Sequence, residues 1–151
     1  MSQNLGLFAH LLGVITWVGG MALLYFCLRP AAMALPPPQR LPLWVAVFSR
    51  FFPLVWVSIA LILLSGFGKL GIIGFGAAPK AWHLMMLIGL VMVAVFVSIW
   101  FGPWVRLKRA VAAGDWQAGA AALNSIRQRV ALNLVLGVIT IAVATLGLAL
   151  L

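Results

Sequence analysis

The chain has 151 residues, 66% of them hydrophobic, and carries ten Lys or Arg side chains against a single acid, Asp115. A water-soluble domain of this size needs a charged shell that such a composition does not supply. The net charge of +9 is typical of basic residues retained on one side of a membrane, and no basic stretch is interleaved with a polar surface suited to nucleic acid. We therefore predict an integral membrane protein with the lipid bilayer as its main partner and no nucleic-acid partner.

Four apolar runs are long enough to cross a bilayer as helices, at about residues 5–28, 44–68, 81–104 and 129–151. They predict an all-α integral membrane protein, in which residues 1–151 form one domain folded as an up-and-down four-helix bundle. The first run is not expected to be a signal peptide, because residues 1–4 contain no basic residue and the run is too long. It is expected to remain as a permanent span.

The segments between the runs contain helix breakers and one capping residue. The first span is expected to stop at Arg29-Pro30, and Pro53 is expected in the first turns of the second span. Residues 66–80 contain five glycines and a proline, which predicts a loop. Asp115 is a plausible N-cap for a helix that could continue into the fourth span without a break.

The distribution of basic residues predicts the orientation. The first and third loops with their flanks hold eight Lys or Arg residues, and the second loop holds two. By the positive-inside rule, the first and third loops face the cytoplasm, and both termini face the periplasm of a bacterial inner membrane. The eight are Arg29, Arg40, Arg50, Arg106, Lys108, Arg109, Arg127 and Arg129, and the two are Lys69 and Lys80.

The two histidines of the chain, His10 and His83, stand near the starts of the first and third spans. Both spans enter from the same face, and at about 1.5 Å per residue the two rings reach one level of the outer leaflet within about a turn. A polar ring inside hydrocarbon is a candidate functional site. Spans one and three lie on the diagonal of an up-and-down bundle, where two imidazoles can bind one iron from opposite sides. We predict that His10 and His83 are the axial ligands of a haem, held noncovalently because no CxxCH sequence is present.

Residues at helical spacings around the two histidines are the predicted haem contacts, and two outer lysines are expected to meet its propionates. The contacts are Gly6, Gly13, Val14 and Trp17 in span one, Met86, Leu87 and Leu90 in span three, and the lysines Lys69 and Lys80. Two alternatives stay open. The glycines could let helices pack closely, and each histidine could bond a neighbouring helix.

Two protein ligands fill both axial positions of a haem iron, which favours electron transfer. The main functional prediction is a b-type membrane cytochrome with one haem b per chain, an electron-transfer protein or oxidoreductase. It would exchange electrons at the periplasmic side with a quinol or a periplasmic partner. The sequence leaves open the redox partner, the potential, turnover of any substrate, and whether chains form homo-oligomers.

Copper is the alternative metal, because thioether and thiol groups suit Cu(I). Adjacent helical residues point about 100° apart, so Met85 and Met86 cannot easily aim at one ion. The soft side chains considered are Met21, Met33, Met85, Met86, Met92 and Cys27.

Four stretches resemble bacterial membrane proteins of the copper-resistance protein D-like (CopD-like) family. They are residues 10–21 (HLLGVITWVGGM), residues 28–30 (LRP), residues 50–53 (RFFP) and residues 116–127. The resemblance implies a four-helix membrane protein with a role in copper transport or resistance. A related group, the membrane protoporphyrinogen oxidase of bacteria, has a histidine in its first span and binds haem b. This resemblance carries a haem-ligand role onto His10 and His83, and adds a porphyrinogen-oxidising enzyme as a third candidate function.

Overall fold

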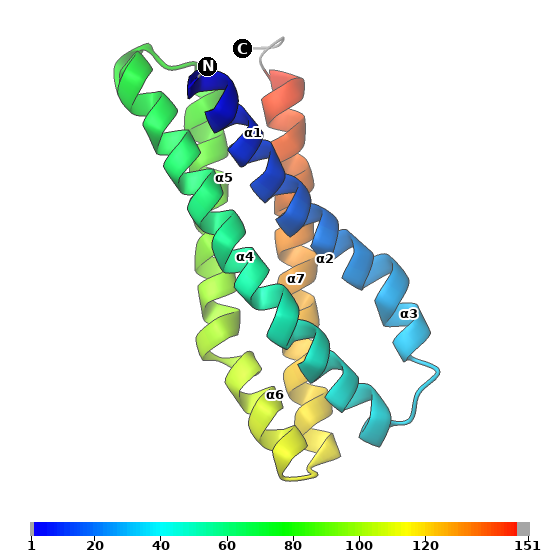
Figure 1. Ribbon diagram of the computed structural model, residues 1–151. Coiled ribbons are helices and arrows are strands. Elements are labelled where there is room, and N and C mark those ends of the chain that lie inside the picture. The colour runs from blue at the N-terminus through cyan, green and yellow to red at the C-terminus, as the bar shows by residue number, and fades with distance from the viewer. Residues whose placement is uncertain (1, 148–151) are drawn as a thin grey trace.

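The computed structural model describes residues 2–147, and in that range all regular structure is helical, in four spans (Figure 1). Each span is long and apolar enough to cross a membrane, which confirms the predicted all-α four-span bundle. The first span consists of α1 (Ser2–Val14), η1 (Ile15–Gly19), α2 (Gly20–Leu23), η2 (Leu24–Leu28) and α3 (Arg29–Ala32), where η1 and η2 are π-helical. The others are α4 (Pro37–Ile73), α5 (Lys80–Phe101) with α6 (Pro103–Ala112), and α7 (Trp116–Thr145), with a 3₁₀ turn, η3 (Phe75–Ala77), before α5.

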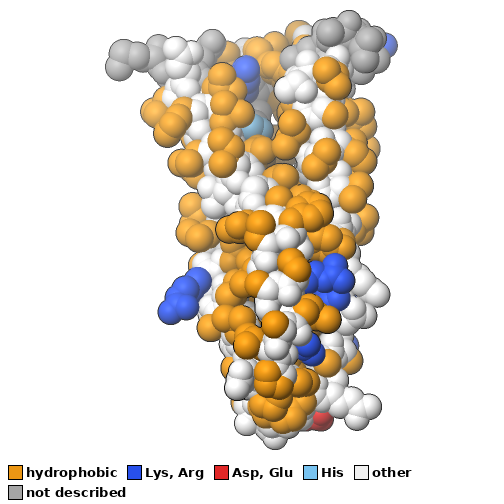
Figure 2. Space-filling model, turned by 90° about the vertical axis from the view of Figure 1, so that its right-hand side faces the viewer, with side chains coloured by type: hydrophobic (Ala, Val, Ile, Leu, Met, Phe, Trp, Pro, Cys, Tyr) orange, Lys and Arg blue, Asp and Glu red, His pale blue; other side chains and the backbone are white. Residues whose placement is uncertain are grey.

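The bundle has two chemically different ends. The start of α1, the α4–α5 connection and the last turns of α7 lie together at what we call the terminal end (Figure 1). The α3–α4 and α6–α7 connections lie at the opposite end, which we call the basic end because eight of the ten Lys and Arg residues belong to the helix halves next to those two connections. Figure 2 shows apolar side chains over most of one face of the molecule, as a lipid-facing surface requires.

Glycine, proline and aspartate residues set the helix boundaries. Gly74 ends α4 with φ of 87°, and Gly114 has φ of 69° in the turn before α7; both values favour a residue without a side chain. Oδ1 of Asp115 accepts a hydrogen bond from the backbone N–H of Ala118 at 2.9 Å. The predicted N-cap is therefore confirmed, and α7 continues from it without a break into the fourth span.

The structure corrects three of the predicted boundaries. Residues 66–73 are helical and belong to α4 rather than to a loop, because backbone groups at membrane depth are satisfied most readily inside a helix. Pro53 lies in the interior of α4, which begins at Pro37 and is longer than the predicted span. The first span continues through Pro30 to Ala32, and the wider π-helical turn η2 comes directly before α3, which contains this proline. Residues 148–151 of the predicted fourth span lie outside the described residues.

Aromatic side chains fill the middle and the basic half of the bundle. Phe52 is 1% exposed, stacks on Phe48 with ring centroids 4.8 Å apart, and meets Phe96 and Trp104 edge to face at 5.5 and 5.2 Å. Trp17 adds the first span to this cluster through an edge contact with Phe96. The aromatic core thus joins three of the four spans and closes the bundle below its terminal end.

Candidate ligand-binding cavity at the terminal end

A cavity of about 490 Å³ lies between the helices at the terminal end. It is lined by residues of α1, α4 and α5, with Ala144 from α7. In Figure 2 it is visible as a hollow near the terminal end, with a histidine and a basic side chain inside it. Its volume falls in the range of small-molecule sites, and its walls are mostly apolar.

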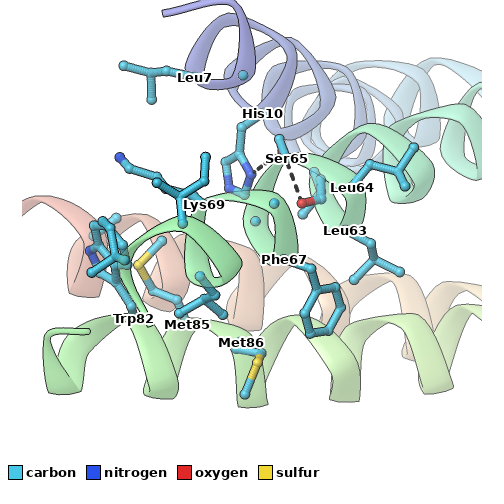
Figure 3. Close-up of a pocket in the computed structure, with 18 residues that line it drawn as sticks. Leu7, His10, Leu63, Leu64, Ser65, Phe67, Lys69, Trp82, Met85 and Met86 are labelled. Carbon is cyan, nitrogen blue, oxygen red and sulfur yellow. Dashed lines mark hydrogen bonds between the residues drawn. The ribbon is translucent and has the colours of Figure 1, made fainter. Parts of the chain in front are cut away.

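His10 lines this cavity from α1, and its ring orientation is set by Ser65 of α4 (Figure 3). Nδ1 of His10 lies 2.9 Å from Oγ of Ser65. The Ser65 hydroxyl has one proton, and it donates that proton to the backbone carbonyls of its own helix at Leu61 and Ile62. With that proton used, we assign Nδ1 of the neutral His10 ring as the donor to Oγ, and Nε2 then keeps its lone pair. An imidazole in that tautomer is a metal ligand or a hydrogen-bond acceptor.

The lone pair of His10 has soft and cationic neighbours in the same cavity. Met85 and Met86 of α5 both line it, but Figure 3 shows Met85 extending toward the middle of the cavity while Met86 points away from His10. Nζ of Lys69 lies 4.7 Å from the ring centroid of Trp82, a cation–π contact between α4 and α5. The lining of the cavity thus contains one imidazole, two thioethers and one ammonium group within a mostly apolar wall, and of the two thioethers that of Met86 points away from His10.

His83 lies apart from the cavity lining, at the start of α5. Its Nε2 is 3.1 Å from the carbonyl oxygen of Phe75, and its Nδ1 is 3.2 Å from that of Pro79. The Phe75 ring also packs edge to face against it, with centroids 4.5 Å apart. A nitrogen that donates to a carbonyl has no lone pair for a metal, so a ligand role for His83 requires the loss of one contact. The shared iron of His10 and His83 stays a prediction.

The other predicted contact residues fall into two groups. Gly6, Lys69 and Met86 line the cavity with His10. Trp17 belongs to the aromatic core, and a Cβ at Gly13 would lie 2.9 Å from the Ser58 carbonyl oxygen, so α1 and α4 pack closely there. The predicted residues that do not line the cavity are Gly13, Val14, Trp17, Lys80, Leu87 and Leu90. Their roles as cofactor contacts stay predictions.

Sequence reasoning missed Ser65 and Trp82. Ser65 carried a usable signal, because it is a polar residue near the outer end of an apolar run, at a depth comparable with that of His10. Trp82 carried none, because a tryptophan at a span end is an ordinary interfacial anchor. Among the residues that the structure describes, no group of three or more His, Cys, Asp or Glu side chains could hold a metal ion. A metal in the cavity would therefore need thioether or external ligands beside His10.

The fold and the cavity define a four-span membrane protein with a ligand-sized site at one end of its bundle. The family model described as copper resistance protein D matches residues 45–146, more than half of the 151 residues. The chain belongs to the copper resistance protein D family. The match includes Ser65, Lys69 and Met85 and begins after His10. Comparisons with curated proteins and with solved structures found no match.

Proposed function

We propose that this protein binds Cu(I) in the cavity at the terminal end and handles copper as its cargo. The observation that carries the proposal is the presence of two soft groups in the lining of one cavity, the imidazole of His10 from α1 and the thioether of Met85 from α5. Cu(I) prefers thioether and imidazole ligands. Membership of the copper resistance protein D family supports the same metal.

The aromatic core favours capture of copper at one face rather than flow through an open pore. Phe52, Phe96 and Trp104 pack together below the cavity. By the positive-inside rule, the basic end faces the cytoplasm, so the cavity would take its cargo from the periplasmic side of a bacterial inner membrane. Both termini would then be periplasmic.

Copper titration of the purified protein under reducing conditions tests this proposal, with a chromophoric Cu(I) chelator as competitor. We expect one Cu(I) per chain, loss of binding in His10→Ala, and an affinity at least about tenfold lower in Met85→Leu, a difference of about 1.4 kcal/mol. Met86→Leu is the matched control, because that side chain points away from His10, and its affinity should stay within about twofold. Equal losses in the two methionine variants would contradict the proposed ligand pair.

The second candidate ligand is haem b, which the size of the cavity favours. A volume of about 490 Å³ is far larger than a single ion needs. His10 fits the role of one axial ligand, and Lys69 at the same cavity suits a propionate carboxylate. Bound haem would supply one-electron chemistry, and exchange with a quinol or a periplasmic protein would follow. His83 remains the proposed second ligand, at the expense of its contact with Phe75 or Pro79.

An absorption spectrum separates the two candidates. Protein purified from haem-replete membranes should show a low-spin b-type signal in the reduced-minus-oxidised difference if haem is the ligand. His83→Ala should then change the spin state, whereas the same substitution should leave Cu(I) binding unchanged if copper is the cargo. Stoichiometric copper without porphyrin would remove the haem candidate.

A further inference from the structure

Three arginines from three separate helices gather near the basic end. Arg29 of α3 and Arg127 of α7 line one small hollow between the first, second and fourth spans. Arg40, near the start of α4, adds a third positive charge close to these two. The positive-inside rule requires cations on one membrane face, but it does not require that their side chains lie close to one another. Repulsion between the positive charges disfavours such closeness. The cluster therefore needs a further explanation.

The chain itself offers no carboxylate side chain to neutralise this cluster. Asp115 is the only acidic residue in the sequence, and its Oδ1 caps the N-terminus of α7. Nε of Arg127 is buried and has no hydrogen-bond partner among residues 2–147. A buried guanidinium N–H without an acceptor is unfavourable, and a neighbouring positive charge adds to the cost.

The remaining contacts of the cluster are weak and leave most of its donors available. The Arg29 guanidinium lies 5.0 Å from the ring centroid of Tyr25. Nη1 of Arg40 is 3.9 Å from the sulfur of Met33, which is a poor acceptor. An external anion with several acceptor oxygens would pair with these donors and relieve the repulsion at the same time.

We propose that Arg29, Arg40 and Arg127 form a binding site for a phosphate group, supplied by the headgroup of an anionic phospholipid. Guanidinium groups match the geometry of phosphate oxygens, and basic pockets between spans on the cytoplasmic side suit anionic headgroups. The hollow of about 20 Å³ is too small to admit a nucleotide, so the phosphate lies at its mouth, where the lipid surface begins. The buried rings of Trp44 and Phe48 form part of the lining of the hollow, so the acyl chains of the lipid lie outside it. This site is separate from the cavity that contains His10.

Native mass spectrometry of the full chain released from nanodiscs tests the site. The nanodiscs contain phosphatidylcholine with a minor fraction of phosphatidylglycerol. We expect the wild-type chain to retain phosphatidylglycerol preferentially, and Arg127→Gln to lower that retention at least about fivefold. The matched control is Arg50→Gln, which removes one exposed charge from α4 outside the hollow and should leave retention within about twofold.

A second arm separates the lipid from free phosphate. Inorganic phosphate is added to the protein in nanodiscs of phosphatidylcholine alone, and the unfolding temperature is measured. A rise in the wild type that Arg127→Gln lacks, without preferential lipid retention, would identify free phosphate as the ligand of the same site. Arg29→Gln repeats both measurements at the other arginine that lines the hollow, in case Arg127→Gln does not fold. Equal losses in Arg127→Gln and Arg50→Gln, or no response to either ligand, would overturn the proposal.

Discussion

The basic half of the bundle and its terminal half are held together in different ways. In the basic half, Phe48, Phe52 and Trp104 fill the space between helices with stacked and edge-to-face rings. In the terminal half, a cavity of about 490 Å³ occupies the corresponding space. There a hydrogen bond from His10 to Ser65 links α1 to α4. In a membrane, helix association depends on close packing and on polar contacts. The basic half relies mainly on packed rings, whereas the terminal half combines the close contact of α1 with α4 at Gly13 and the polar contact of His10 with Ser65.

This difference assigns stability to one half and ligand binding to the other. A packed aromatic core resists change because each ring is in contact with several others. Side chains that line a cavity have fewer such contacts, so they can be replaced at less cost. A substitution in the aromatic core should therefore lower stability, whereas a substitution of similar size in the lining of the cavity should mainly change ligand affinity.

Removal of a core ring should give the largest effect on stability. Phe52→Ala deletes a side chain that is 1% exposed and packs near five other aromatic rings, so we expect a loss of about 3 kcal/mol from the cavity left behind. Phe67→Ala is the matched control, because Phe67 lines the terminal cavity and is 50% exposed. Thermal unfolding in detergent should show a large fall in Tm for Phe52→Ala and a small one for Phe67→Ala. Similar falls would mean that the two halves are packed alike.

The seam between α1 and α4 gives the next largest effect. A Cβ at Gly13 would lie 2.9 Å from both the backbone oxygen of Ser58 and a side-chain carbon of Ile62. Backbone cannot move aside cheaply, so Gly13→Ala should destabilise the protein by about 1–3 kcal/mol. Gly19→Ala lies in the same span with no atom within 4 Å of the added carbon, and it should leave Tm unchanged or slightly raised. Tolerance of Gly13→Ala would show that the seam can open.

The four spans were predictable from the sequence because hydrophobic length alone fixes which segments can cross a bilayer. The Asp115 cap was also predictable, since Asp directly before a helical run is a preferred N-cap residue. The continuation of α4 through residues 66–73 was not, because the glycine content that breaks helices in water is tolerated where the bilayer enforces internal hydrogen bonds.

The candidate site was only half predictable. His10 was visible as a polar ring in an apolar run, and it lines the cavity at the terminal end. The contact between Ser65 and His10 depends on the rotation of α4 about its own axis. Hydrophobic periodicity does not specify that rotation in a span that is apolar on all sides. The contacts of His83 with Phe75 and Pro79 depend on the conformation of the α4–α5 connection, which composition alone does not specify.

The hydrogen bond between Ser65 and His10 predicts an effect on affinity rather than on stability. Ser65→Ala removes the acceptor that holds the ring in the Nδ1–H tautomer, so we expect Cu(I) affinity to fall about tenfold, or about 1.4 kcal/mol. Ser65→Thr keeps the hydroxyl and should restore most of the affinity. Ser58→Ala is the control, because that hydroxyl donates to Leu54 within α4, away from the cavity. If Ser65→Ala lowered Tm but left copper affinity unchanged, Ser65 would be a structural residue alone.

The smallest effect should come from Gly66, and its sign should be opposite to that of Gly13. A Cβ at Gly66 would lie 3.9 Å from Cε1 of His10, an ordinary van der Waals contact beside the cavity. Gly66→Ala should therefore raise stability by about 0.5–1 kcal/mol, because alanine loses less backbone entropy in a helix than glycine does. The Tm values of Gly13→Ala and Gly66→Ala should be measured in the same detergent. Both variants add one methyl group, the first where α1 and α4 pack closely and the second at the wall of the cavity. Destabilisation by Gly66→Ala as large as that by Gly13→Ala would mean that the space beside His10 is already filled.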